Sequence, residues 1–367
     1  MSFVEKCNQI QNFNIQDYLA GVSEHDVENI LKKNKLDETD FLYLLSPAAE
    51  NYLEEMAQKA HNLTNQWFGK TIQLYMPLYI SNYCQNQCRY CGFNQKNKIK
   101  RRKLSLKEIE KEARIIADKG IRHVVVLTGE SRKHTPLSYL QEAIRISKKY
   151  FASVCLEIFP LKTEEYRKLN QSGADCLTVY QEVYDRKIYR ELHPSGPKRN
   201  YEFRLDTPER AARAGFRAVN IGTLFGLANV EKEAYLSGLH AHYLENNYLD
   251  CEISLSIPRL NDHEGDFTSE HNLSDKKFVQ ILLAYRLFLP KVGINISTRE
   301  SANFRNNLLK LGVTKMSAGS RTEVGGYQKD NKTSGQFDIS DRRSVKSVVN
   351  MIKKSGYQPV FKNWEQV

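Results

Sequence analysis

The sequence lacks any long hydrophobic run. No apolar stretch approaches the roughly 18 residues needed to cross a bilayer, and the first residues, MSFVEKCNQIQNF, do not place a basic region before an apolar one. We therefore expect a cytoplasmic protein that makes no membrane contact. With 367 residues, of which 41% are hydrophobic, the chain is long enough for one barrel of about 250 residues with extensions.

Cysteines are few and unevenly placed. Seven occur, an odd number, and without an export signal a disulfide framework is not expected. Cys155, Cys176 and Cys251 lie inside apolar, strand-like runs, which is typical of free cysteines that pack in a core. No cysteine follows Cys251, so the last third of the chain offers no thiolate ligand for a metal.

Acidic residues are outnumbered, since 43 Asp and Glu face 54 Lys and Arg, for a net charge of +11. The densest basic stretch is KNKIKRRK at 96–103. Such a stretch can bind RNA or an acidic protein surface, but a solvated loop is the preferred interpretation. No known nucleic-acid-binding module accompanies it, so we expect no nucleic-acid partner.

The hydrophobic pattern divides the chain into three parts. Residues 1–70 have apolar residues at helical spacing, with Ser23 and Ser46 as plausible N-caps, and predict a helical extension. From 71 to 320, short apolar runs alternate with amphipathic helices. The runs are TIQLYMPLYIS, HVVVLTGE, SVCLEIFP, CLTVYQE, RAVNIGTLFG, CEISLSIP, VGINIST and VTKMSAG. Eight such units predict an α/β protein with a parallel (β/α)8 barrel, and an open doubly wound sheet is the alternative.

The remaining residues, 321–367, contain glycines and a final helix, which we expect to lie across the barrel as a cap. In a (β/α)8 barrel the chemistry lies in the loops after the strands. Unusual polar residues follow this rule. Glu130 ends the second strand, Glu157 the third and Glu182 the fourth, and Arg321 follows the eighth. These side chains should converge on one mouth of the barrel.

A cysteine triplet follows the first predicted strand. Cys84, Cys88 and Cys91 are spaced C-x3-C-x2-C, with no fourth cysteine nearby. A closed zinc site or an ordinary iron-sulfur cluster normally takes four protein ligands. Three cysteines therefore suit a 4Fe-4S cluster whose fourth iron binds a non-protein ligand. A zinc site completed by a distant histidine, or a ferredoxin motif without its last cysteine, remains open.

The triplet resembles the signature of the radical S-adenosylmethionine (SAM) superfamily, C-x3-C-x-aromatic-C, with Tyr90 as the aromatic residue. The resemblance implies one 4Fe-4S cluster and SAM as cofactors. In that superfamily SAM chelates the open iron, and one electron splits it into methionine and a 5'-deoxyadenosyl radical. The protein then supplies position and excludes water.

A wider resemblance covers about residues 20–365. The segments are PLYISNYCQNQCRYCGF, LTGES, LEIFPL, VYQEVY, LHPSGPKRNYEFRLDTPERAARAG, SIPRL, MSAGSRTEVGGY, QFDISDRRS and GYQPVFKNW, and together they resemble the 2-iminoacetate synthases of thiamine biosynthesis. The resemblance implies cleavage of the Cα–Cβ bond of L-tyrosine into p-cresol and 2-iminoacetate. It also implies thiazole synthase as partner and a flavodoxin- or ferredoxin-type electron donor. Our separate hypothesis is that the basic face with Lys100, Arg101 and Arg102 helps to dock thiazole synthase.

Related enzymes limit the alternatives. The maturase of iron-only hydrogenase cleaves tyrosine in the same way but carries a second cluster on a cysteine-rich tail, which this sequence lacks. The related tryptophan lyase has no such tail, so cysteine counting does not exclude tryptophan or another amino acid as substrate. A non-catalytic metalloprotein that binds RNA is an alternative of another class.

The resemblance also implies roles for single residues. A buried substrate carboxylate needs a cation or several donors, and Arg321, with Tyr79 and Ser340, matches this role. The alternatives are an ion pair between Arg321 and Glu323, and a helix N-cap at Ser340.

The SAM contacts are predicted in the same manner. Arg204 matches the arginine that holds the SAM carboxylate, and Glu130 lies near the SAM amino group. Glu157 and Glu182 suit the ribose or the ammonium group. We expect His193 to pack a loop. No acid or base for the tyrosine phenol is identified.

Overall fold

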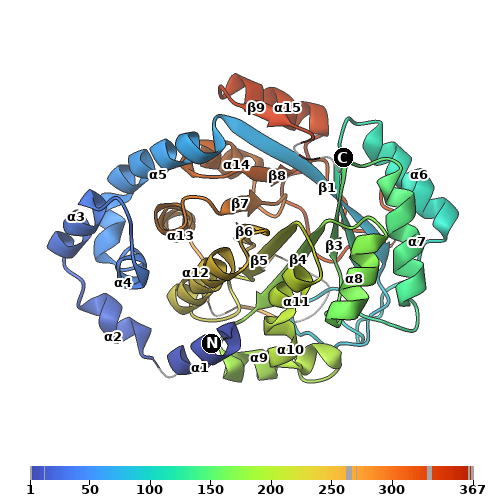
Figure 1. Ribbon diagram of the computed structural model, residues 1–367, viewed down its shortest axis with the longest axis horizontal. Coiled ribbons are helices and arrows are strands. Elements are labelled where there is room, and N and C mark those ends of the chain that lie inside the picture. The colour runs from blue at the N-terminus through green and yellow to red at the C-terminus, as the bar shows by residue number, and fades with distance from the viewer. Residues whose placement is uncertain are drawn as a thin grey trace.

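Eight parallel strands close into a barrel in the computed structural model, which describes residues 2–11, 13–261, 267–269, 271–328, 333–362 and 364 (Figure 1). The strands are β1 (Thr71–Ser81), β2 (His123–Thr128), β3 (Ser153–Glu157), β4 (Cys176–Glu182), β5 (Ala218–Thr223), β6 (Glu252–Ser256), β7 (Gly293–Ile296) and β8 (Lys315–Ser317). Each strand pairs with the next, and β1 pairs with both β2 and β8. The barrel is therefore closed, and the open doubly wound sheet is wrong.

The strands form where the sequence predicts them because their residues are apolar on both faces. In β2, for example, five of six residues are buried, as expected for a strand between a barrel core and a layer of helices. All eight predicted runs contain a strand. The carboxyl ends of the strands meet at one mouth, where the loops that follow them come together.

Helices surround the barrel and precede it. They are α1 (Phe3–Ile10), α2 (Ile15–Ala20), α3 (Glu24–Lys32), α4 (Glu38–Tyr43), α5 (Leu53–Phe68), α6 (Leu106–Ala117), α7 (Leu137–Lys148), α8 (Thr163–Gln171), α9 (Arg186–Leu192), α10 (Tyr201–Leu205), α11 (Thr207–Arg213), α12 (Val230–Asn247), α13 (Asp275–Phe288), α14 (Ala302–Leu308) and α15 (Val345–Lys354). Three short 3-10 helices complete the set, η1 (Ala48–Tyr52), η2 (Pro197–Arg199) and η3 (Leu309–Leu311).

Capping explains two of the helix starts. Ser23 caps α3 in a capping box with Asp26, as predicted. Ser46 instead accepts the backbone N–H of Ala49 at the beginning of η1. The following helix, α5, starts at Leu53 without a side-chain cap. The N-cap role of Ser46 therefore belongs to the short turn and not to the long helix.

The helices before the barrel pack along the side formed by α12 and α13 (Figure 1). The Phe3 ring stacks on His240 of α12 at 4.0 Å between centroids, and α5 lies against α13. The buried residues of these helices and of the barrel form one hydrophobic core. The division into 1–70, 71–320 and 321–367 stays a prediction, and its outer limits, Met1 and Val367, lie outside the described residues.

The C-terminal part separates into two pieces. Residues 333–340 pass over the mouth, where the Gln336 carbonyl accepts the N–H of Gly92 at 3.2 Å. The final helix, α15, does not lie across the barrel as expected. It packs on the outside with β9 (Gln358–Val360), which pairs with the first residues of β1 (Figure 1). Its apolar face, with Val345 and Val348 buried, needs the side of the barrel to cover it.

Two cysteines differ from expectation in their bonding. Cys155 and Cys176 are buried in the core, as predicted, but they also form a disulfide between β3 and β4. They are register partners on adjacent strands, with Cα atoms 4.2 Å apart, so their side chains point to the same side. The expected absence of disulfides is wrong for this pair. Cys251 is half-buried and packs against the core.

Candidate active site

The loop after β1 carries the cysteine triplet to the mouth of the barrel. Two glycines allow the loop to lie close to its neighbours. A Cβ atom on Gly92 would lie 2.6 Å from the Gln336 carbonyl oxygen, and one on Gly129 would lie 2.5 Å from the Tyr83 carbonyl oxygen. Cys88 is buried, whereas Cys84 and Cys91 are partly exposed to the cavity that all three line.

The triplet suits an iron-sulfur cluster better than a closed zinc site, because such a zinc site normally takes four protein ligands. Among the described residues, the group of three ligand side chains close enough to hold one metal ion is His123, Cys155 and Cys176, which does not include the triplet. Cysteines that bind different irons of one cluster need not converge on a single ion. Burial, with the neighbouring cysteines, raises the pKa of Cys88 to about 12, although Lys198 opposes this.

Tyr90 supports the loop from inside. Its hydroxyl group lies 2.7 Å from Nε2 of His193, whose Nδ1 lies 2.7 Å from the carbonyl oxygen of Tyr189. Because that carbonyl only accepts, Nδ1 donates to it and Nε2 accepts from Tyr90. His193 is fully buried. The predicted packing role of His193 is confirmed, and both of its ring nitrogens are engaged, so it does not complete a zinc site.

Glu182 lies at the end of β4, where it pairs with two cationic side chains. It adopts a φ of 70°, and the register with β5 shifts between Tyr180 and Glu182. Its carboxylate lies 2.7 Å from Nζ of Lys198 and 3.2 Å from Nη2 of Arg204. Burial raises the pKa of Glu182, but Lys198 and Arg204 outweigh burial and hold that pKa below its usual value.

Arg204 approaches the mouth from α10. Its Nε donates to the Tyr180 carbonyl at 2.7 Å, which fixes the plane of the guanidinium group. Glu130 and Arg204 line the same cavity as the cysteines. The carboxylate of Glu130 accepts a hydrogen bond from the side chain of Asn86, in the cysteine loop, at 2.6 Å. The structure thus brings Glu130, Glu182 and Arg204 together beside the triplet.

Glu157 lies at the centre of the mouth. It lines the cavity of the cysteines and two adjoining cavities, one of which reaches into the barrel. Burial, followed by repulsion from Glu182, raises its pKa to about 7. A carboxyl group in this state can exchange a proton near neutral pH.

The inner cavity of the barrel is lined by aromatic, aliphatic and hydroxyl side chains. Its lining includes Tyr75, Tyr79, Val125, Leu127 and Tyr180. Tyr79 is buried and donates its hydroxyl hydrogen to Oε1 of Gln336 at 2.8 Å. The predicted substrate residue Tyr79 therefore faces this cavity.

The structure does not bring Arg321 into the mouth. In the described part of the chain its side chain is exposed and lines none of the three cavities around Glu157. Because Arg321 follows β8 at a turn, its backbone N–H bonds to the Tyr327 hydroxyl while the side chain points outward. No ion pair between Arg321 and Glu323 occurs among the described residues. The predicted position of Arg321 beside the substrate is therefore corrected.

Arg299, which follows β7, was missed by sequence reasoning and takes the place expected of Arg321. It lines both inner cavities and the larger outer one, and its guanidinium carbon lies 3.3 Å from the centroid of the Phe337 ring. Burial lowers its pKa. The signal was present, because Arg299 and Glu300 end the run VGINIST as charged residues at the mouth of a barrel strand.

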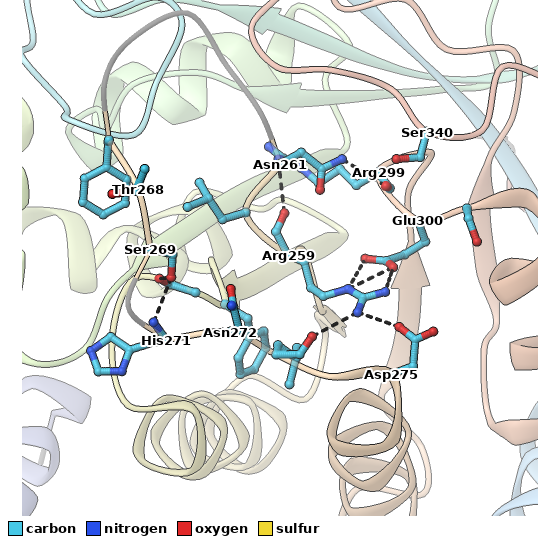
Figure 2. Close-up of a pocket in the computed structure, with 16 residues that line it drawn as sticks. Arg259, Asn261, Thr268, Ser269, His271, Asn272, Asp275, Arg299, Glu300 and Ser340 are labelled. Carbon is cyan, nitrogen blue, oxygen red and sulfur yellow. Dashed lines mark hydrogen bonds and ion pairs between the residues drawn. The ribbon is translucent and has the colours of Figure 1, made fainter.

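An outer cavity of about 810 Å³ adjoins the mouth next to Arg299 (Figure 2). Arg259 crosses it, held by Glu300 and by Asp275 at 2.7 Å. Ser340 lies near Arg299 at its edge and is exposed. Ser340 does not cap a helix, because α15 begins later, behind Ser344. The cavity thus connects solvent with Arg299.

The basic stretch at 96–103 is not a uniform solvated face. Arg101 is half-buried and donates to backbone carbonyls of the cysteine loop, and Arg102 pairs with Glu108 at 2.6 Å. Lys96, Lys98 and Lys100 are exposed. Within the described residues, no helix combines the length and the apolar character needed to span a bilayer.

A three-cysteine loop after the first strand of a closed (β/α)8 barrel, facing a charged mouth, is the arrangement of a radical SAM enzyme. Residues 78–236 match the radical SAM superfamily. Residues 256–358 match the family described as the biotin and thiamin synthesis associated domain.

Comparison with individual proteins narrows the family. The 2-iminoacetate synthases of Salmonella typhimurium and Escherichia coli are each 36% identical to this chain over 365 residues, covering 99% of it and 97% of their own length. The chain belongs to the 2-iminoacetate synthase family. A 3-methylornithine synthase of Methanosarcina acetivorans is 25% identical over 90% of the chain and 93% of its own.

Solved structures agree in fold. A crystal structure of HydG, a maturase of the FeFe-hydrogenase, superimposes with a TM-score of 0.90 at 29% identity, covering 99% of this chain and 81% of HydG. The HydG of Carboxydothermus hydrogenoformans gives 0.85 at 31% identity over 98% and 83%. A methylornithine synthase gives 0.74 at 24% identity over 91% and 97%, which speaks for the fold alone.

Proposed function

We propose that this protein is a radical SAM lyase that cleaves the Cα–Cβ bond of L-tyrosine into 2-iminoacetate and p-cresol for thiazole formation in thiamine biosynthesis. The observation that carries this is the identity of 36% with 2-iminoacetate synthases over nearly the whole length of both chains. The three-cysteine loop and the aromatic-lined cavity behind it are the parts that such a reaction requires.

Cys84, Cys88 and Cys91 would hold one 4Fe-4S cluster. When bound, the cluster and SAM supply a carbon radical that takes hydrogen from the substrate amino group. Tyr90 keeps the loop in place through His193. The donor set fits, because all three cysteines line one cavity and leave one iron without a protein ligand.

SAM would lie beside the triplet, against Glu130, Glu182 and Arg204. Arg204 is a cation for the SAM carboxylate, and the two acidic groups are acceptors for its ammonium and ribose groups. The pairing of Glu182 with Arg204 and Lys198 supports this, because it keeps the carboxylate ionised and in a fixed orientation. Glu157 lies between this region and the inner cavity and would contact the ribose or the substrate amino group.

The tyrosine carboxylate would bind Arg299 rather than Arg321. Among the described residues no carboxylate forms an ion pair with Arg299, whose recorded contacts are the Phe337 ring and the Arg259 carbonyl oxygen. A cation that has no ion pair in a partly dry cavity binds an incoming anion strongly. With the carboxylate there, the side chain would extend into the inner cavity past Tyr79, and Ser340 would lie at the entrance.

Two protein partners belong to the proposal. Thiazole synthase would receive the unstable imine, and a flavodoxin- or ferredoxin-type donor would supply the electron. The exposed lysines 96, 98 and 100, next to the cysteine loop, support an acidic partner at that face. Arg101 and Arg102 form their contacts within the protein, so we no longer assign them to the docking face. We place the protein in the cytoplasm, where a reducing medium protects an exposed cluster.

The test is anaerobic reconstitution with iron and sulfide, followed by a reductant, SAM and L-tyrosine, with chromatography for 5'-deoxyadenosine and p-cresol. We expect both products, and neither from Cys88→Ala. Cys251→Ala is the matched control, because Cys251 is half-buried outside the mouth, and should retain activity. Formation of deoxyadenosine without p-cresol would exclude tyrosine as the substrate, and tryptophan would be tested next. Intact SAM with bound zinc would reject the proposal.

A further inference from the structure

Arg101 turns away from solvent and into the cysteine loop, although it lies in the most basic stretch of the sequence. Its Nη1 donates to the carbonyl oxygens of Asn82 at 2.8 Å and Phe93 at 2.9 Å. Its Nη2 donates to those of Asn94 at 2.6 Å and Asn97 at 3.3 Å. One side chain therefore satisfies four backbone acceptors of the same loop.

The four acceptors lie on both sides of the triplet along the chain. Asn82 precedes Cys84, whereas Phe93, Asn94 and Asn97 follow Cys91. The guanidinium group thus ties the beginning of the loop to its end. This needs the planar fork of an arginine, because the compact ammonium group of a lysine cannot reach four carbonyl oxygens in a plane.

The same contacts place a positive charge next to the cluster ligands. Burial lowers the pKa of Arg101, and the charges of Cys84 and Cys91 act against this and raise it. Two of its acceptors, the carbonyl groups of Asn82 and Phe93, lie two residues from Cys84 and Cys91 in the chain, so the guanidinium charge is held beside the cluster ligands.

We propose that Arg101 is a positioning residue of the cluster loop, which holds the three cysteines in their binding arrangement and raises the potential at which the cluster accepts an electron. Reduction adds negative charge to the cluster, and a fixed positive charge beside two of its ligands stabilises the reduced form. The inference rests on the proposed cluster but not on the choice of substrate. It replaces the assignment of Arg101 to a docking face.

The first test measures the potential of the reconstituted protein by titration followed with electron paramagnetic resonance, without substrate. Arg101→Gln removes the charge, and Arg101→Lys keeps it. Lys100→Gln is the matched control, because it removes the same charge from an exposed neighbouring side chain. We expect Arg101→Gln to be at least tenfold harder to reduce, about 59 mV for a one-electron couple, and Arg101→Lys and Lys100→Gln to differ from the parent by less than threefold. Equal potentials in Arg101→Gln and Lys100→Gln would overturn the proposal.

The second test measures the loop without the cluster, and so applies even if a variant fails to bind iron. Hydrogen exchange of the apoprotein should be at least tenfold faster over 82–97 in Arg101→Gln and Arg101→Lys, with the barrel strands unchanged. Unchanged exchange over 82–97 would overturn the positioning role. Because neither test follows tyrosine cleavage, a parent protein that takes up a cluster but makes no p-cresol would reject the substrate and leave Arg101 to be judged separately.

Discussion

At the residue scale, the proposed binding of the substrate carboxylate depends mainly on Arg299. It lies between the outer cavity and the interior of the barrel. Within the described chain no acidic side chain forms an ion pair with it, although the charges of Glu157 and Glu182 act on it from further away. Arg321, the arginine that the sequence favoured, is exposed. The two residues thus offer a direct comparison of a half-buried cation with a surface cation.

We expect Arg299→Met to raise the KM for tyrosine by roughly 10- to 100-fold, because a charge-assisted hydrogen bond contributes about 1.5–3 kcal/mol. Uncoupled cleavage of SAM to deoxyadenosine should continue, since Arg299 is proposed to hold the substrate. Arg321→Met should leave KM within about twofold. Steady-state assays of p-cresol for both variants measure this, and the reverse pattern would return the carboxylate to Arg321.

Glu157 makes stability depend on pH. Its pKa is raised from 4.5 to about 7 by burial and by Glu182. Between these values the unfolded chain has lost the proton and the folded chain retains it. The folded state then binds more protons, so the free energy of unfolding falls as the pH rises from about 4.5 to 7.

We therefore expect Glu157→Gln to reduce the loss of apoprotein stability between pH 5 and pH 7. Glutamine stays neutral at both values, so the linked proton is removed. Urea unfolding at the two pH values measures the effect, with the exposed Glu55→Gln as control. An unchanged difference in Glu157→Gln would mean that Glu157 is ionised throughout. Glu233, whose buried carboxyl also has a pKa of about 7, should maintain part of the slope.

At the scale of elements, the sequence predicts those features that depend on residues close together in the chain. Every barrel strand was predictable because a strand buried on both faces needs an apolar run, and VVVL or SVCLE supplies one. The triplet was predictable because its ligands are close in sequence. The direction of Arg321 was not, because a residue after a strand can point inward or outward, and the turn at Tyr327 decides it.

The C-terminal segment shows the same limit. Its amphipathic helix was predictable, but which surface covers the apolar face of α15 depends on the pairing of β9 with β1, more than 280 residues away in sequence. The mouth is instead covered by the segment around Gln336, which has no helical or strand pattern. Its position depends on scattered single contacts, among them those of Gln336 with Gly92, Tyr79 and Thr322.

Gly92→Ala tests that contact. The added Cβ would lie 2.6 Å from the Gln336 carbonyl oxygen and 3.1 Å from that of Gly335, so one of the two segments must move. We expect a loss of about 1–3 kcal/mol in local stability, seen as lower iron content after gel filtration and faster hydrogen exchange over 333–340. Gly21→Ala is the control, because its Cβ would meet nothing closer than 3.6 Å. Equal iron content in the two variants would contradict the packing described here.

At the scale of the whole molecule, the barrel separates two tasks. In the proposed function the inner cavity and Arg299 hold the small substrate, while the cysteine loop lies at the rim, where electrons would arrive from another protein. Charge is distributed accordingly, with the free lysines 96, 98 and 100 beside that loop in a chain of net charge +11. An acidic donor would be drawn to this rim by long-range attraction.

Replacing Lys96, Lys98 and Lys100 together with glutamine should therefore slow cluster reduction by a flavodoxin- or ferredoxin-type donor roughly tenfold at low ionic strength, because steering raises association rates by 10- to 1000-fold. The difference should shrink at 0.5 M salt, where screening removes the attraction. Reduction by dithionite, a small molecule, should stay the same. The control replaces Lys346, Lys353 and Lys354 on α15, which changes the net charge equally but away from the mouth. Stopped-flow absorbance records the reduction rates of the parent and both triple variants under each condition. If the control slows reduction as much as the triple variant at the loop, net charge rather than a docking face governs electron delivery.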